Sequence, residues 1–131
     1  MSGGQRILGL VAGNGRFPFV WARGARRAGA RVVAVALRGE ADPALAAEVD
    51  ELVWGHLGQF GRMADELKGR GAREAAFVGG VGKLKAFASA RPDLRTIKAL
   101  SRLRSLNDDV LLRAIAGIFE AEGVRIVAST E

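Results

Sequence analysis

The hydrophobic positions of this chain fall into short all-apolar runs that alternate with longer amphipathic segments. The runs are RILGLVA at 6–12, RVVAVAL at 31–37, AAFVG at 75–79 and VRIVA at 124–128, with a weaker one, ELVWG, at 51–55. Runs that are apolar on both faces are typical of buried parallel strands, because helices cover both faces of such a sheet. The pattern therefore predicts about five strands in one parallel sheet.

The segment after the weak run has the spacing of an amphipathic helix. Phe60, Met63, Ala64 and Leu67 recur at i, i+3, i+4 and i+7, and charged residues occupy the opposite face. The glycines of KGRG at 68–71 end this helix.

Two further helices are expected, one on each side of this one along the chain. The first runs from about 18 to 28, where a proline opens the helix and three arginines share a polar side. The second covers 93–105 and places Leu94, Ile97 and Leu100 on one side and basic residues on the other.

The last helix has the clearest boundaries. Asn107 is a good N-cap, and Asp108 and Asp109 suit the positive end of the helix dipole. A core stripe follows and Gly123 ends the helix. The stripe consists of Leu111, Ala114, Ile115 and Ile118.

This alternation of strands and helices predicts an α/β fold, a Rossmann-like or flavodoxin-like parallel sheet with helices on both faces. At 131 residues the chain fits one domain, 1–131. In such sheets ligands bind at the carboxyl ends of the strands, so the loops after the strands are where we expect a site.

Composition narrows the possible chemistry. The chain is 49% hydrophobic and 26% charged, which is typical of a globular protein. It has no cysteine and one histidine, His56, so thiol chemistry and histidine metal clusters are excluded. It lacks an apolar run of the roughly 18 residues that would span a bilayer, and MSGGQR is no signal-peptide start, so we expect a cytoplasmic protein.

The net charge of +6 is concentrated in one segment, 83–104. The rest of the chain holds 13 of the 20 basic and 13 of the 14 acidic residues. A segment with so large an excess of positive charge suggests an anionic partner, such as phosphates, nucleic acid or an anionic membrane. The alternative is a helix face that is simply solvated. Its charged residues are Lys83, Lys85, Arg91, Asp93, Arg95, Lys98, Arg102 and Arg104.

Glycine is abundant in the strand-end loops GNGRFP (13–18), GHLGQFG (55–61) and GGVGK (79–83). Glycine lets backbone N–H groups approach an anion, and a following helix N-terminus adds favourable potential. The first loop differs from the dinucleotide pattern because Pro18 stands where the third glycine belongs, which argues against NAD. A purely structural tight turn is the alternative. In the last loop Leu84 follows Lys83, so it is no Walker A loop.

The adjacent aspartates allow two interpretations. Asp108 and Asp109 together are suited to a divalent metal, but first-turn acids are common for the helix dipole alone, which we favour. The residues of this chain offer no nucleophile, base and orienting group that could act together.

Several motifs in order resemble one family. AGNGRFP, VVAVALRGEADP, LGQFG, RPDL and NDDVLLRAI look like the N-terminal domain of the LpxI-type UDP-2,3-diacylglucosamine pyrophosphatases, over essentially the whole chain. The resemblance implies a Rossmann-like domain that binds UDP-2,3-diacylglucosamine together with a C-terminal catalytic domain. It also implies a divalent metal, Mg²⁺ or Mn²⁺, hydrolysis to UMP and lipid X in lipid A synthesis, and a peripheral place on the inner membrane.

The resemblance carries the substrate-binding role onto particular positions, although Asn107 stands where the family has glycine and GGVGKLKAF also departs from it. We expect this chain to be a substrate-binding half that is inactive alone and has no catalytic residue of its own. The competing hypotheses are a stand-alone nucleotide-binding or regulatory domain and, less favoured, a nucleic-acid binder. The implied substrate-binding residues are Gly13, Asn14, Gly15, Arg16, Gly58, Gln59, Gly79 and Asp108.

Overall fold

A computed structural model describes residues 5–81, 92–105 and 107–127, except the side chain of Asp108. The elements follow the predicted alternation along the chain. They are β1 (Ile7–Ala12), α1 (Phe17–Arg27), β2 (Arg31–Leu37), the 3₁₀ helix η2 (Pro43–Glu48), β3 (Glu51–Gly55), α2 (Phe60–Gly69), β4 (Glu74–Val78), α4 (Leu94–Ser101), α5 (Asp108–Ala121) and β5 (Arg125–Ile126).

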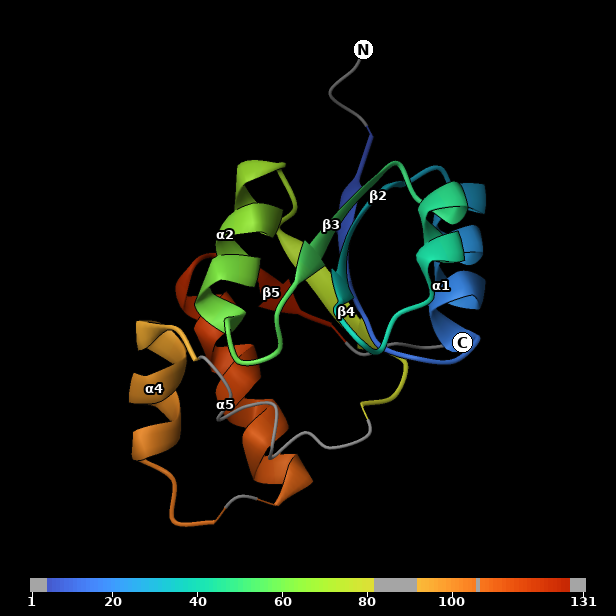
Figure 1. Cartoon of the computed structure of the whole chain (residues 1–131). Helices are drawn as coiled ribbons and strands as arrows, with labels where there is room; N and C mark the ends of the chain where they lie inside the picture. Colours follow the sequence, from blue (N-terminus) through green and yellow to red (C-terminus); the bar gives the residue numbers. More distant parts are fainter. Residues whose placement is uncertain (1–4, 82–91, 106, 128–131) are drawn as a thin grey trace.

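The strands form one parallel sheet in the order β3-β2-β1-β4-β5 (Figure 1). This order confirms the predicted Rossmann-like fold, and it places the reversal of strand order between β1 and β4. The strands β2 and β3 coincide with their apolar runs, whereas β5 has only two residues.

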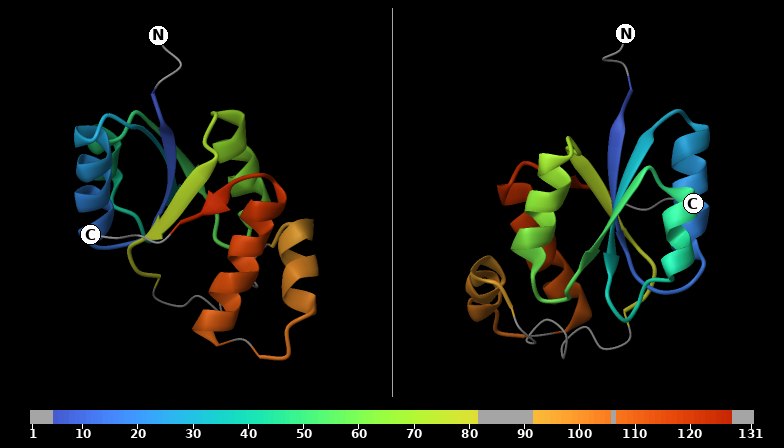
Figure 2. Two further views of the ribbon diagram at one scale, coloured as in Figure 1. Left: turned by 180° about the vertical axis from the view of Figure 1, so that it is seen from behind. Right: turned by 45° about the horizontal axis from the view of Figure 1, so that its top comes forward.

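Helices cover both faces of the sheet (Figure 2). Helix α1 and η2 lie on one face, and α2, α4 and α5 lie on the other. The sheet residues differ between the faces, because Ala34 and Ala36 of β2 point toward α1 while Val33 and Val35 point toward α2 and α5. Small side chains on the first face let α1 lie close to the strands, and larger ones fill the second core.

The predicted core stripes of α2 and α5 are buried, except that the alanine of the α5 stripe is only half-buried. Phe60, Met63 and Leu67 of α2 and Ile115 of α5 are each at most 3% exposed. Phe119 of α5 adds an edge-to-face ring contact with a β4 residue, at 5.4 Å between centroids. Periodicity alone therefore located these two helices and their inward faces. The β4 residue whose ring contacts Phe119 is Phe77.

Helix α4 is oriented differently from what its apolar side suggested. Leu94 and Ile97 are 73% and 47% exposed, whereas Thr96 is fully buried. Polar contacts decide this orientation, since the Arg95 guanidinium bonds to Asp65 of α2 at 2.6 Å and also pairs with α5. The helix is also shorter than the expected 93–105.

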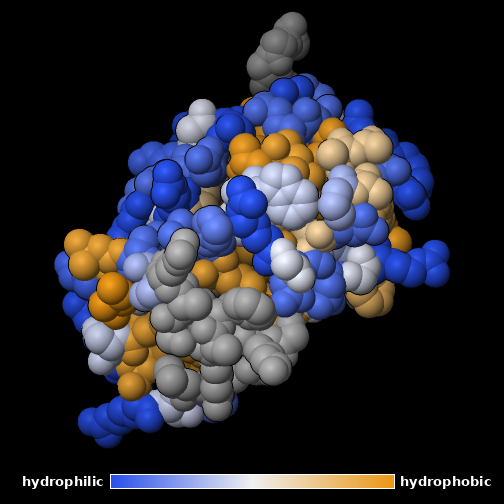
Figure 3. Space-filling model, in the orientation of Figure 1, coloured by the Kyte–Doolittle hydropathy of each residue, from blue (hydrophilic) through white to orange (hydrophobic). Residues whose placement is uncertain are grey.

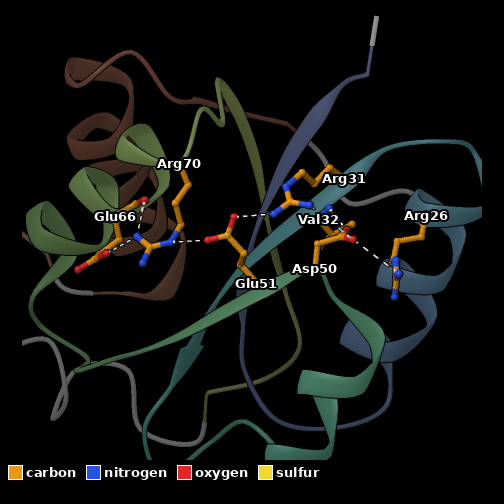
Figure 4. Close-up of polar contacts among 7 residues, drawn as sticks. All are labelled: Arg26, Arg31, Val32, Asp50, Glu51, Glu66 and Arg70. Carbon is orange, nitrogen blue, oxygen red and sulfur yellow. Dashed lines mark hydrogen bonds and ion pairs between the residues drawn. The ribbon is translucent and has the colours of Figure 1, made fainter. Parts of the chain in front are cut away.

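A network of charges ties the elements together where β2 and β3 begin (Figure 4). The Glu51 carboxylate accepts from Arg31 at 2.8 Å and from Arg70 at 3.1 Å, which lowers the pKa of Glu51. The neighbouring Asp50 accepts the Val32 backbone N–H at 2.7 Å. These contacts connect α1, β2, β3 and α2 at the amino ends of the strands, whereas the expected site is at their carboxyl ends. The charged side chains of this network are those of Arg26, Arg31, Asp50, Glu51, Glu66 and Arg70.

Candidate functional site

The loops after β1 and β4 meet at the point where the strand order reverses. The Gly13 N–H donates to the Val78 carbonyl at 2.9 Å. Beyond it, Asn14 and Gly80 form an antiparallel bridge, with N···O distances of 2.8 and 3.1 Å. The two glycine loops of the sequence thus hold each other by backbone hydrogen bonds.

Two of the predicted binding glycines are required by this close approach. A Cβ on Gly13 would lie 2.2 Å from the Gly80 carbonyl oxygen. Gly79 has a φ of +98°, and its Cβ would lie 2.6 Å from the Asn14 carbonyl oxygen. The packing of the loops therefore accounts for both glycines without a ligand.

The next residues of the first loop are open to solvent. Gly15 has a φ of +90°, and a Cβ on it would meet nothing within 4 Å. Arg16 is exposed at the N-cap of α1, and its side chain makes no capping bond. The Asn14 side chain donates to Glu40 of the β2 loop at 2.7 Å. The open part of this turn therefore lies beside the positive end of the α1 dipole.

The third loop is buried at its centre, around Gly58. Gly58 is buried with a φ of +97°, and its carbonyl accepts the Asp93 N–H at 3.1 Å. Gln59 follows as the N-cap of α2, where its side chain makes no capping bond. Gly58 thus lies under the segment that leads into α4.

Residues at the start of α4 cap α2 as well. The Asp93 carboxylate accepts the Arg62 N–H at 2.8 Å through one oxygen and the Thr96 N–H at 2.9 Å through the other. The Thr96 hydroxyl accepts the Phe60 N–H at 3.2 Å. Two donors of the first turn of α2 are therefore already satisfied by protein groups.

A small apolar cavity of about 70 Å³ lies below the loop junction, between the strand ends and α5. Gly13 and Gly79 form part of its lining. Leu112 of α5, which is 44% exposed, also borders it. The remaining lining is apolar and consists of residues such as Val11, Leu37, Leu57, Phe60 and Phe77.

The basic segment is divided by the structure. Arg95 belongs to the packing between helices, because it bonds to Asp65 and Glu122 and lowers the pKa of Asp65. The sequence placed Arg95 among the cations available to an anionic partner, and these ion pairs correct that expectation. Lys98 and the cations that follow it are exposed and form no ion pair within the described residues. These following cations are Arg102 and Arg104, while Lys83, Lys85 and Arg91 lie outside the described part of the chain.

At the start of α5, the Asn107 side chain caps the helix as predicted and accepts the Val110 N–H at 2.9 Å. The Asp109 carboxylate pairs with Arg113 one turn later, at 3.3 Å. The side chain of Asp108 is not among those that the structure describes. Within the described residues, no three acidic, histidine or cysteine side chains gather as metal ligands. The described donors thus do not make a metal centre.

Comparison with known proteins decides the family. The family described as the LpxI N-terminal domain matches residues 7–131. The chain belongs to the LpxI family, over its N-terminal domain. UDP-2,3-diacylglucosamine pyrophosphatase LpxI of Caulobacter vibrioides is 34% identical over 134 positions, which cover 97% of this chain. The chain spans 45% of that LpxI relative's length.

One solved structure supports the fold, and the fold alone. The crystal structure of gox2253 has a TM-score of 0.56 at 21% identity and covers 92% of this chain and 33% of its own. A leucoanthocyanidin reductase from Vitis vinifera, solved with NADPH, has a TM-score of 0.48 at 15% identity and covers 92% of this chain and 48% of its own. Within the described part of this LpxI-family chain, no helix is long and apolar enough to cross a membrane.

Proposed function

We propose that this chain is the substrate-binding half of a UDP-2,3-diacylglucosamine pyrophosphatase of lipid A synthesis. The observation that carries the proposal is the match to the LpxI N-terminal domain over 7–131, supported by 34% identity to the Caulobacter enzyme. The relative's name gives the reaction, which is hydrolysis of UDP-2,3-diacylglucosamine.

The open part of the β1 turn is the contact that we assign to the substrate phosphates. Gly15 leaves its backbone accessible, and the Arg16 guanidinium forms no ion pair within the described residues. Backbone N–H groups, an arginine and the start of a helix together favour a phosphate. Asn14 supplies a polar side chain beside them.

The catalytic part of the reaction is assigned elsewhere. The described residues place no group of three metal-ligating side chains around Asp109, whose carboxylate pairs with Arg113 at the surface. We therefore assign the divalent metal, Mg²⁺ or Mn²⁺, chiefly to the C-terminal catalytic domain of the family. This chain's own residues would bind and orient the nucleotide end of the substrate, and the chain would be inactive alone.

A matched pair of glycine variants tests the turn. Gly15 and Gly29 both have positive φ, at +90° and +95°, and both have open space at the Cβ position. They lie near opposite ends of α1, so Gly15→Val and Gly29→Val introduce the same strain at different places. We expect Gly15→Val to weaken UDP-2,3-diacylglucosamine binding in calorimetry, and Gly29→Val to leave it unchanged. Equal affinities in two folded variants would contradict the assignment.

A mixing experiment separates this function from a stand-alone nucleotide-binding or regulatory domain. This chain is combined with the separately expressed C-terminal domain of the Caulobacter relative, and release of UMP is measured. Restored hydrolysis supports the pyrophosphatase half. Nucleotide binding without hydrolysis supports the regulatory alternative instead.

The same proposal includes contact with an anionic membrane surface through α4. Leu94 and Ile97 are exposed, one turn apart, and the exposed Lys98 lies one turn after Leu94. Figure 3 shows this apolar surface over α4 at the lower left, bordered by hydrophilic residues. Apolar residues next to cations are typical of helices that lie at a membrane interface.

Vesicle co-sedimentation tests the membrane contact. We expect binding to anionic vesicles to exceed binding to neutral ones, and Ile97→Gln to reduce it. Leu112→Gln, an exposed position of α5, is the matched control. Equal sedimentation with neutral and anionic vesicles would remove the membrane part of the proposal and leave the substrate part untouched.

A further inference from the structure

A second cavity, of about 250 Å³, lies at the carboxyl ends of β2 and β3 beside α2. The Gly15 turn does not line it, but Gln59, one of the implied substrate-binding residues, does. Figure 3 shows the surrounding face, where hydrophilic and apolar residues alternate. The side chains that line it include Arg38, Trp54, His56, Arg62, Met63 and Glu66.

The hollow exists because the edge strand ends in glycine. A Cβ on Gly55 would lie 2.7 Å from Val35 Cγ1 and 3.2 Å from Met63 Cγ. The floor therefore remains bare backbone over two apolar side chains. Trp54, the preceding residue of β3, is 38% exposed although tryptophan is a large apolar side chain.

The cavity carries unbalanced positive charge. Within the described residues, Arg38 and Arg62 form no ion pair. Among the described lining residues the one carboxylate is that of Glu66, and it is bound by Arg70 at the C-cap of α2. Arginines at the amino ends of the same strands, such as Arg31, are in contrast paired with acids. Two free guanidinium groups at one hollow are suited to an anion that accepts several hydrogen bonds.

We propose that this edge cavity binds a nucleoside phosphate. The base stacks on the exposed indole of Trp54, and the phosphate accepts hydrogen bonds from the Arg38 and Arg62 guanidinium groups. The volume approaches the lower end of ligand pockets, about 300 Å³, so it accommodates a nucleotide rather than an acylated sugar. The site is independent of whether the Gly15 turn binds the pyrophosphatase substrate.

Amide and indole NMR spectra of the whole chain test the site. The chain has two tryptophans, and Trp21→Phe assigns their indole N–H signals. AMP, UMP, uridine and inorganic phosphate are titrated separately. We expect AMP and UMP to shift the Trp54 signal and leave that of Trp21 unchanged. We expect either nucleotide to bind more tightly than phosphate or uridine alone.

Charge and stacking are then tested by variants whose spectra confirm the fold. Arg38→Gln and Arg62→Gln should each weaken AMP binding by roughly tenfold. Arg27→Gln removes an exposed arginine of α1 on the other face of the sheet, so it should leave the affinity for AMP unchanged. Trp54→Leu should weaken AMP binding without changing phosphate binding.

Three results would overturn the proposal. These are an unmoved Trp54 signal, phosphate that binds as tightly as AMP, and an Arg27→Gln variant that weakens binding as much as Arg38→Gln. Loss of substrate binding in Gly15→Val with AMP binding retained would show that the two sites are separate.

Discussion

Asp93 is expected to stabilise two helices at once. Its carboxylate accepts the Thr96 N–H as the N-cap of α4, and its second oxygen accepts the Arg62 N–H in the first turn of α2. Gln59, at the N-cap of α2, provides no capping bond of its own. Asp93→Ala therefore removes a capping acceptor from both helix N-termini.

The magnitude follows from the number of caps that are lost. Replacing an N-cap side chain by alanine costs about 1 kcal/mol, so Asp93→Ala should lower the free energy of unfolding by about 2 kcal/mol. Asn107→Ala is the matched control, because Asn107 caps α5 alone; we expect about 1 kcal/mol. Asp93→Asn should lie between wild type and Asp93→Ala, since the amide offers one acceptor oxygen instead of two.

Urea unfolding followed by far-UV circular dichroism measures these differences. Thermal unfolding provides a second reading, with a shift of about 4 °C per kcal/mol for a domain of this size. If Asp93→Ala is destabilised no more than Asn107→Ala, Asp93 does not act as a shared cap. A reduced slope of the urea transition would indicate instead that α4 unfolds separately from the sheet.

Two further predictions concern the two ends of the sheet. Gly13→Ala should destabilise the protein by about 1–3 kcal/mol, because its Cβ would displace the Gly80 carbonyl. The control is Gly24→Ala on the open surface of α1, which should be neutral or stabilising. Equal urea midpoints for the two variants would contradict the loop packing. Glu51→Gln should lower the urea midpoint at pH 7, since Arg31 and Arg70 hold the pKa of Glu51 below its ordinary 4.5. This contribution is complete above pH 4.5 and is lost as the pH falls through the lower folded pKa, so the difference between wild type and Glu51→Gln should vanish in acid; a constant difference would refute the pairing.

The sequence predicted the sheet and most helices because their signals are local. The strand run at 31–37 is apolar on both faces, and the stripe from Phe60 to Leu67 has helical spacing, so neither depends on distant contacts. The cap at Asn107 was equally readable from residue type.

The orientation of α4 could not be predicted in the same way. Its apolar side chains suggested burial, but Thr96 and Arg95 make polar contacts with residues 30 or more positions away. Such contacts leave no periodic signal in the sequence. The proposed edge cavity was missed for the same reason, because Arg38, Trp54 and Arg62 come from three separate elements.

The bridge between Asn14 and Gly80 changes how the glycine turn is interpreted. In dinucleotide-binding sheets the pyrophosphate lies at the point where the strand order reverses, over the first glycine turn. Here that point is closed by backbone hydrogen bonds between the β1 and β4 loops. A ligand that touches both loops must therefore lie above the bridge, where Gly15 and Arg16 are open, and cannot enter between the strands. The third glycine of the dinucleotide pattern serves close packing of the helix on the strand, and Pro18 takes its place here in the first turn of α1, so the phosphate contact that we assign depends on Gly15 and Arg16 alone.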